Sequence, residues 1–138
     1  MIYSFLQNGD SAVTVQFKNE ISEEVNRRVT GLCNRIEAKH IDGIVELVPT
    51  FASLTVFYDC TIINSKKLKK KVEALINGKE CDVKSTAKVW NIPVCYDDEF
   101  ALDMKNVCSH TALEREEVIK LHTSKPYLIY MLGFFPGF

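Results

Sequence analysis

The stretch AVTVQF at residues 12–17 alternates apolar and polar side chains, so that Val13, Val15 and Phe17 share one face of an extended chain. A period of two is typical of a β-strand with one buried side. A second run of strand type precedes it at residues 2–6. The residues between the two runs contain Asn-Gly-Asp, which tolerates the positive φ angles of a tight turn. The chain is therefore predicted to begin with a β-hairpin.

The segment after this hairpin has the residue spacing of an amphipathic helix. Apolar side chains recur there at intervals of three and four residues, with Ile21, Val25, Val29, Leu32, Cys33 and Ile36 on one stripe. Ser22 is a suitable N-cap residue, and the helix dipole favours the negative charges of Glu23 and Glu24 in the first turn. We expect this helix to end near His40, before Gly43.

Two further strands and a second helix follow. Residues 44–48 are apolar except for Glu46, and residues 53–58 alternate in polarity, so both are predicted to be strands. Residues 65–76 again show helical spacing, and Asn77-Gly78 ends the pattern.

The order of these elements, ββαββα, indicates an α+β, sandwich-like domain at residues 1–80. Helices that follow hairpins favour one antiparallel or mixed sheet with both helices on the same face. A polar, weakly patterned linker is expected at residues 81–88, and a second domain begins at residue 89.

The second predicted helix is strongly basic, with lysines at positions 66, 67, 69, 70 and 71. Two interpretations are open: a docking patch for an anionic partner, or a helix face that is simply solvated. No aromatic side chain lies among the lysines, as a binder of single-stranded nucleic acid would need, and the solvated face is favoured. Lysines near a helix N-terminus nevertheless oppose the helix dipole, so their position is unusual.

Two apolar runs in the second half of the chain are candidates for strands. Residues 89–96 contain Pro93, which indicates an edge strand or a bulge, and residues 127–132 are strongly apolar. The chain then closes with GFFPGF at residues 133–138, whose phenylalanines would leave a large apolar patch exposed on a monomer. We therefore expect residues beyond 89 to need further chain or another molecule, such as a second copy, to cover them.

Two short helices are expected between these runs. The first spans residues 103–110, and the second begins with a capping box formed by Thr111 and Glu114. An acidic cluster lies around the turn that precedes them, at Asp97, Asp98, Glu99 and Asp103. It lacks the alternating ligands and the central glycine of an EF-hand loop, so a solvated turn is favoured over a cation site.

Composition and cysteine usage exclude several classes of protein. Hydrophobic residues make up 46% of the 138 residues and charged residues 25%, which is typical of a globular protein, and the formal net charge of −1 favours neither nucleic acid nor an acidic membrane surface. The first residues lack the pattern of a signal peptide, so a cytoplasmic location is expected. The five cysteines are odd in number and form no C-x-x-C pair, which argues against a disulfide scaffold and a structural zinc site.

Residue spacing alone does not identify an activity. The six glycines form no phosphate-binding loop, and no G-x-S-x-G motif occurs. The three histidines, His40, His110 and His122, show no metal-ligand spacing. His122 is expected at a helix C-terminus, where the dipole favours a positive charge. That position explains the residue without chemistry, and a catalytic role is the alternative.

Three stretches of the chain carry the pattern of a known family. They are GDSAVTV at residues 9–15, ELVPTF at residues 46–51, and the series IPVCY (92–96), LHT (121–123) and MLGFFPGF (131–138). Together they resemble the KipI family, which includes the B subunit of 5-oxoprolinase and allophanate hydrolase subunit 1. Members of that family carry I-P-V-x-Y, then L-H-T, then Y-M-x-G-F-x-P-G-F, so the resemblance covers essentially the whole chain.

The resemblance implies an N-terminal α+β domain followed by a cyclophilin-like β-barrel, of which residues 89–138 would be the truncated start. Some bacterial members act with a KipA-type subunit (allophanate hydrolase subunit 2) and a LamB/YcsF-type subunit to hydrolyse 5-oxoproline with ATP. Another member inhibits a sporulation sensor histidine kinase by binding it and is not an enzyme. The resemblance favours a 5-oxoprolinase subunit that is inactive alone, with ATP bound in the assembled complex and no metal in this chain. The kinase inhibitor is the alternative.

The resemblance also implies site residues. His122 is the candidate catalytic residue because imidazole transfers protons near neutral pH. Substrate- or partner-binding candidates are Tyr96, Asp103, Gly133, Phe134, Pro136, Gly137 and Phe138, and the alternative is that their loop is a structural corner of the barrel. The chain departs from the family at residues 96–104, where YDDEFALDM replaces the usual Y-G-G-E-F-G-P-D-L.

Overall fold

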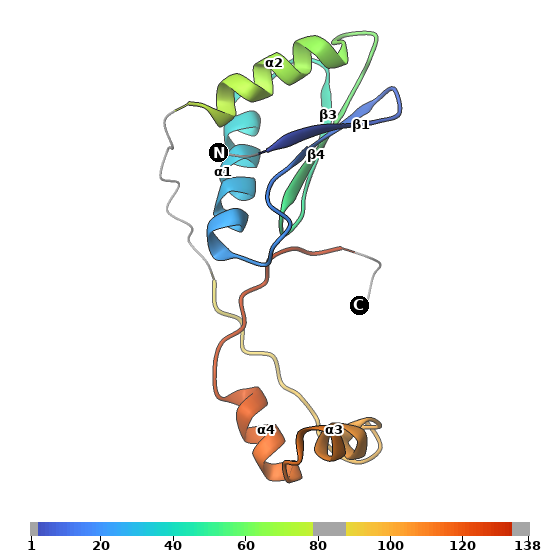
Figure 1. Cartoon of the computed structure of the whole chain (residues 1–138), viewed down its shortest axis with the longest axis vertical. Coiled ribbons are helices and arrows are strands. Elements are labelled where there is room, and N and C mark those ends of the chain that lie inside the picture. Colours follow the sequence, from blue (N-terminus) through green and yellow to red (C-terminus); the bar gives the residue numbers. More distant parts are fainter. Residues whose placement is uncertain (1–2, 79–87, 134–138) are drawn as a thin grey trace. The chain divides into compact units, whose positions relative to one another are not determined.

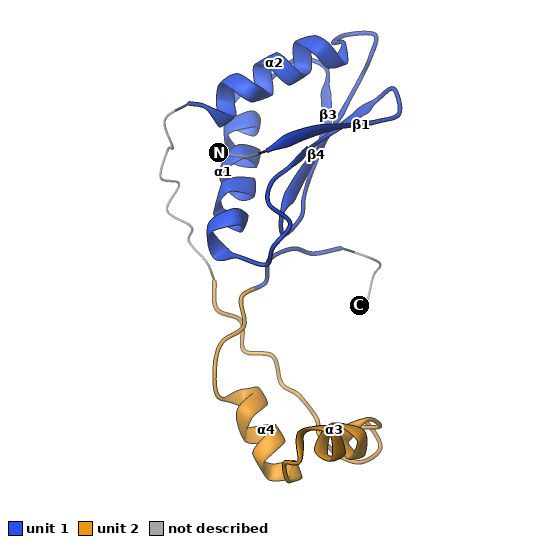
Figure 2. Cartoon of the chain, viewed as in Figure 1, with its two compact units in different colours: residues 1–84, 129–138 blue, residues 85–128 orange. Residues whose placement is uncertain are grey.

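The computed structural model describes residues 3–78 and 88–133 of the chain (Figure 1). Two compact units are present, one of residues 1–84 and 129–138 and the other of residues 85–128 (Figure 2). Unit 1 contains the sheet, and unit 2 contains two short helices. Among the described residues, no helix is long and apolar enough to cross a membrane.

Unit 1 is built on a four-stranded antiparallel sheet in the strand order β1-β2-β4-β3. Its elements are β1 (Ser4–Asn8), β2 (Ala12–Gln16), α1 (Glu23–Lys39), β3 (Ile44–Pro49), β4 (Ser53–Tyr58) and α2 (Ser65–Ile76). The hairpin of β1 and β2 pairs Phe5 with Val15, and Gly9 in its turn has a φ of 64°. The predicted ββαββα order and the α+β class are confirmed.

Both helices cover the same face of this sheet, and the core lies between that face and the two helices (Figure 1). The sheet contributes alternate residues of β2 and β4, and each helix contributes its apolar stripe; the fully buried members are Val13, Val15, Val29, Leu32, Ile36, Leu54, Val56, Leu68 and Val72. Complete burial of one such side chain stabilises a fold by about 1.5–3 kcal/mol. This layer is therefore the main source of stability in unit 1.

The opposite face of the sheet carries a short polar network. Thr14 lies there, and its hydroxyl is 2.8 Å from the hydroxyl of Thr55 and accepts from Asn8 Nδ2 at 2.6 Å. Its neighbours leave Thr14 only 7% exposed. A buried hydroxyl needs such partners, because an unpaired one would cost free energy.

The helices of unit 1 begin and end at residues that are suited to those positions. His40 ends α1 with a φ of 44°, and its backbone N–H donates to the carbonyl of Glu37. Ser22 occupies the N-cap position of α1 without a side-chain capping bond. The side chain of Asn64 caps α2 and accepts from the backbone N–H of Lys67 at 2.9 Å.

Unit 2 contains α3 (Met104–Thr111) and α4 (Arg115–Thr123). The predicted capping box at Thr111 and Glu114 is wrong, because Thr111 is the last residue of α3 and Ala112 ends that helix with a φ of 55°. Glu114 is instead the N-cap of α4 and forms a capping box with Glu117, whose carboxylate accepts from the Glu114 N–H at 3.1 Å. The box lies one turn further along the chain than expected.

The two strands predicted at residues 89–96 and 127–132 do not form in this structure, where both segments lack regular secondary structure. A β-strand is stabilised by hydrogen bonds to a neighbouring strand, and neither segment has such a neighbour in the described part of the chain. Their apolar side chains stay exposed; Trp90, for example, is 65% exposed. The cyclophilin-like barrel stays a prediction.

After unit 2 the chain returns to unit 1. Asn26 Nδ2 in α1 donates to the backbone carbonyl of Tyr130 at 2.9 Å. This bond holds the returning segment to the first turns of α1. The GFFPGF ending extends past residue 133, so most of it lies outside the described residues.

Candidate functional site

The candidate site is built on one face of α4, which carries Arg115 at its start and His122 in its last turn. Residues seven apart lie two helical turns from each other on nearly the same side. The segment around Tyr96 lies against this face, because both α4 side chains bond to it. The first bond is made through the Tyr96 side chain and the second through its backbone.

The Tyr96 hydroxyl and His122 Nδ1 form a hydrogen bond. Their rings meet edge to face, with centroids 5.9 Å apart and an interplanar angle of 88°. Tyr127 lies on another side of the imidazole, with ring centroids 5.7 Å apart. Lys125 Nζ is 5.7 Å from the Tyr127 ring centroid, within the range of a cation–π contact. The imidazole is thus in contact with two phenol rings, the second of which also lies near the Lys125 ammonium.

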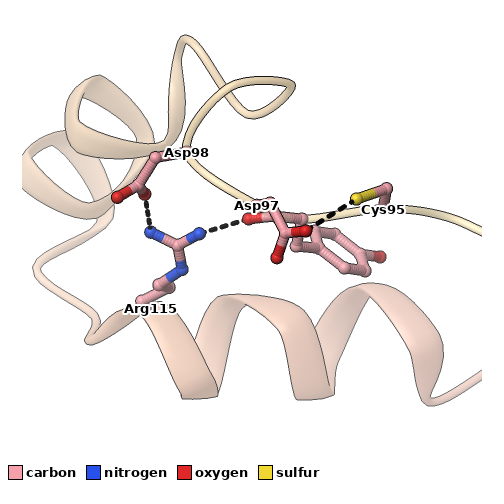
Figure 3. A network of polar contacts seen from close by, with 5 residues as sticks. Cys95, Asp97, Asp98 and Arg115 are labelled. Atoms are coloured by element: carbon pink, nitrogen blue, oxygen red, sulfur yellow. Dashed lines mark hydrogen bonds and ion pairs between the residues drawn. The ribbon is translucent and has the colours of Figure 1, made fainter.

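Arg115 fixes the backbone next to this pair (Figure 3). One of its terminal nitrogens pairs with the Asp98 carboxylate, and the other donates to the backbone carbonyl of Tyr96. The hydrogen bond from Arg115 lowers the pKa of Asp98, and the same bond raises the pKa of Arg115. The planar guanidinium can hold both acceptors at once, which a lysine could not do in the same geometry.

Cys95 extends the network at its other end. Its thiol donates to Asp97 Oδ2, with the two atoms 3.4 Å apart (Figure 3). The two aspartates that follow Tyr96 therefore have different partners. Asp98 pairs with Arg115, and Asp97 accepts a hydrogen bond from the Cys95 thiol. In the ranges 3–78 and 88–133, no group of three or more His, Cys, Asp or Glu side chains is arranged to hold a metal ion.

Chemically, the Tyr96–His122 pair can store and pass on a proton. A neutral imidazole offers one donor and one acceptor nitrogen, and a phenol hydroxyl can take either role. Tyr96 is half-buried whereas His122 is exposed, so a ligand can approach the imidazole from solvent. General acid–base catalysis needs such a group within hydrogen-bonding reach of the reacting atom.

The structure brings together two of the residues that the sequence indicated, Tyr96 and His122. Asp103 lies apart from their hydrogen bond, at the N-cap of α3, and its side chain makes no capping bond. Gly133 is exposed, and a Cβ added there would lie 3.3 Å from the Met131 methyl carbon. The last four candidates fall outside the described residues and are Phe134, Pro136, Gly137 and Phe138.

Arg115 is the residue of this network that sequence reasoning missed. Its signal was the spacing of seven residues to His122 on one helix, with acidic residues in the preceding turn. That signal is weak, because arginines on exposed helix faces are common in soluble proteins. Only the fold shows that its guanidinium reaches the Tyr96 carbonyl.

Comparison with known proteins finds a family model and several relatives that this chain resembles. A family model described as "Carboxyltransferase domain, subdomain C and D" matches residues 3–138. The B subunit of 5-oxoprolinase from Bacillus subtilis (strain 168) is 38% identical, over 99% of this chain and 61% of the relative. The protein of the same name from Escherichia coli O157:H7 is 24% identical, over 94% of this chain and 58% of the relative. The chain spans about three-fifths of the length of these curated relatives.

Solved structures show the same similarity. The conserved uncharacterized protein PH0987 from Pyrococcus horikoshii is 34% identical, with a TM-score of 0.52 over 96% of this chain and 61% of its own. TTHA0988 is 31% identical, with a TM-score of 0.73 over 91% of this chain and 24% of its own. The Kluyveromyces lactis urea carboxylase shares the fold at 20% identity, with a TM-score of 0.69 over 95% of this chain and 14% of its own.

Proposed function

This chain belongs to the KipI family of 5-oxoprolinase B subunits, matched by the model of carboxyltransferase subdomains C and D, and on that basis we propose that it is a subunit of an ATP-dependent 5-oxoprolinase. The observation that carries the proposal is the 38% identity with the Bacillus subtilis relative over 99% of this chain. The reaction is hydrolysis of the cyclic amide of 5-oxoproline to glutamate. The protein is active only in the assembled enzyme.

Its partners in the proposal are a KipA-type subunit and a LamB/YcsF-type subunit. The relatives are named as one lettered subunit of 5-oxoprolinase, which supports the existence of other subunits. The resemblance to 5-oxoprolinase B subunits supports ATP as a substrate of the assembled complex. The guanidinium of Arg115 is already held by Asp98 and the Tyr96 carbonyl, so it does not form a phosphate cradle in this chain. No chemical step of ATP is assigned to these residues.

The Tyr96–His122 pair is assigned the proton transfer of the hydrolysis. When the amide is cleaved, the C–N bond breaks, a C–O bond to water forms, and one proton passes from the water to the leaving nitrogen. The exposed imidazole of His122 can accept and return that proton, with Tyr96 holding the ring through Nδ1. The exposure of His122 in the last turn of α4, with Tyr96 bonded to its ring, supports this role.

The test is reconstitution of the full-length protein with its two partners. Loss of 5-oxoproline is measured with and without ATP, and with each subunit left out in turn. Turnover that needs ATP and all three proteins is the expected result. No turnover in the complete mixture, together with blocked autophosphorylation of a cognate sensor histidine kinase, would instead assign the inhibitor function.

The role of the pair is tested separately in the same assay. His122→Gln is expected to lower kcat by about 10²- to 10⁴-fold, the usual contribution of general acid–base catalysis. The matched control is His110→Gln, which removes an exposed histidine at the end of α3 and should leave kcat unchanged. Normal turnover of the His122→Gln enzyme would remove the proton-transfer assignment but keep the subunit assignment.

A further inference from the structure

The outer face of α2 is more basic than a solvated helix requires. The helix has Lys66, Lys67, Lys69, Lys70 and Lys71 within its Ser65–Ile76 span, whereas the whole chain has a net charge of −1. Lys69 is half-buried beside the apolar stripe of the helix. At 100° per residue, Lys66, Lys67, Lys70 and Lys71 cover the exposed arc opposite to the buried Leu68 and Val72. They form one continuous positive surface, here called the lysine face.

Nothing in the described part of the chain neutralises the lysine face. The ion pairs among residues 3–78 and 88–133 join Lys18 to Glu20, Arg28 to Glu24 and Arg115 to Asp98, and none of them involves α2. Glu73 is the only acidic residue of α2, and its carboxylate accepts from the Tyr3 hydroxyl at 3.1 Å. The one acidic side chain of α2 is therefore hydrogen-bonded to Tyr3, and it forms an ion pair with none of these lysines.

The arrangement also works against the helix itself. Its first turn contains Lys66 and Lys67 and no acidic residue, so positive charge lies at the positive end of the dipole. Lysines four apart, such as Lys66 and Lys70, repel each other. The packing of Leu68, Val72 and Ile76 supplies the stability that these contacts remove. Selection for stability alone would not place the charges there.

From these observations we infer that the lysine face of α2 binds an acidic surface of a partner protein. This inference rests on the proposed function, because it assigns the face to assembly with the partner subunits. A helix of this length extends about 18 Å, enough for an acidic helix or strand with three or four carboxylates in register. Complementary charge of this kind speeds association and selects the partner.

Other polyanions fit the molecule less well. Nucleic-acid binders usually have a strongly basic domain, whereas the pI of this chain is about 6.3. Membrane-surface helices insert apolar side chains beside their lysines, but the large apolar residues of α2 are buried or half-buried in unit 1. A local acidic patch on a protein can approach the lysine face without meeting the negative charges elsewhere on the chain.

The decisive variant is Lys66→Glu/Lys67→Glu in the full-length protein. Glutamate in the first turn agrees with the dipole, so this variant should melt at the same or a higher temperature than the wild type. Its binding to the KipA-type and LamB/YcsF-type subunits is measured separately by calorimetry at low and high salt. We expect binding to one of them to weaken about 10- to 100-fold at low salt, and the wild-type affinity to fall as salt rises.

The matched control is Arg27→Glu/Lys39→Glu on α1, which changes the net charge by the same amount at exposed positions. Lys39 lies in the last turn of α1, where the dipole favours a cation, so this control should lose stability yet keep wild-type binding. Opposite effects of the two variants on melting and binding would separate docking from folding.

Three results would overturn the inference while leaving the proposed 5-oxoprolinase role in place: partner binding unaffected by the α2 variant, loss only of binding to duplex DNA or anionic vesicles, or loss only of self-association in sedimentation. Each would assign the lysine face to solvent, to another polyanion or to a second copy. If the wild-type protein bound neither partner, the proposed function itself would fail.

Discussion

Units 1 and 2 handle their apolar residues in opposite ways. In unit 1 the apolar side chains of β2, β4 and both helices close into one buried layer. In unit 2 neither α3 nor α4 has a buried residue, and the flanking segments expose side chains such as Trp90, Ile92 and Leu128. Helix α4 is instead joined to the segment around Tyr96 by polar contacts of Arg115 and His122. Unit 1 thus has a packed core, whereas the helices of unit 2 have polar contacts but no buried side chain.

The largest expected effect comes from removing core volume in unit 1. Leu54 is fully buried at the centre of β4, and Leu54→Ala should cost about 2–5 kcal/mol of unfolding free energy. Leu121→Ala in α4 truncates a side chain that is 57% exposed and should cost less than about 0.5 kcal/mol. Urea unfolding followed by circular dichroism measures both. Equal costs would mean that unit 2 has a core of its own.

A smaller loss is expected at Gly43, in the connection between α1 and β3. Its φ is 89°, and an added Cβ would lie 2.7 Å from Ile63 Cγ2. Gly43→Ala should therefore destabilise unit 1 by about 1–3 kcal/mol, through backbone strain and overpacking. Gly31→Ala is the control, because Gly31 lies inside α1 with its nearest contact at 3.8 Å and should gain about 0.5–1 kcal/mol. If both variants changed the free energy of unfolding in the same direction, the strain and overpacking assigned to Gly43→Ala would be contradicted.

The same contrast explains how much the sequence could predict. Residue patterns predicted the order and type of every strand and helix of unit 1, although β1 lies at Ser4–Asn8 and not at the predicted residues 2–6. A local alternation such as that of β2 is satisfied by partners within the unit. His40 as the end of α1 was also predictable, since the break before Gly43 is visible in the sequence. Apolar periodicity indicated strands at residues 89–96 and 127–132, but a strand needs a neighbour to bond to, and periodicity does not show whether one is present.

For the site, the sequence indicated Tyr96 and His122 but not the arrangement that joins them. Their contact forms because α4 lies against the segment around Tyr96, which precedes it in the chain. No short-range pattern encodes that arrangement. Arg115 was missed for the same reason, because its acceptor is a backbone carbonyl and leaves no trace in the residue types. The capping box was displaced by one turn, because Glu114 takes the N-cap position that the sequence motif reserves for serine or threonine, with Glu117 as its partner.

The variant Arg115→Gln tests how far polar contacts order unit 2. Loss of the guanidinium should release the backbone of residues 96–98 and raise its amide hydrogen exchange about ten-fold, while exchange in β2 and β4 is unchanged. Arg115→Lys keeps the charge but cannot hold both acceptors, so it should behave nearly as the glutamine variant does. The chemical shifts of the His122 ring protons, recorded by NMR on the same samples, should also change in both variants. Wild-type exchange in Arg115→Lys would show that charge alone holds the segment.

The smallest expected effect is a pH dependence that belongs to unit 1 alone. Burial raises the pKa of the Cys33 thiol above its ordinary value of 9.0, with a smaller contribution from the nearby Glu37 carboxylate. Well below pH 9 the thiol is protonated in both states, and its contribution to stability is fully present. As pH rises further, the unfolded chain ionises first, unfolding releases a proton, and stability is lost by at most about 1.4 kcal/mol per pH unit until the folded thiol ionises too.

Urea unfolding between about pH 8 and about pH 9.5 measures this slope. Cys33→Ala should flatten it, whereas Cys60→Ala, which removes an exposed thiol, should keep it. Tyr3→Phe serves as a further control, because burial and the bond to Glu73 also raise the pKa of the Tyr3 phenol above 10.0. Exchange of amides in α3 and α4 should show no matching change, since Cys33 packs only in the core of unit 1. A slope that survives Cys33→Ala would mean that another group in unit 1 is buried in its neutral form.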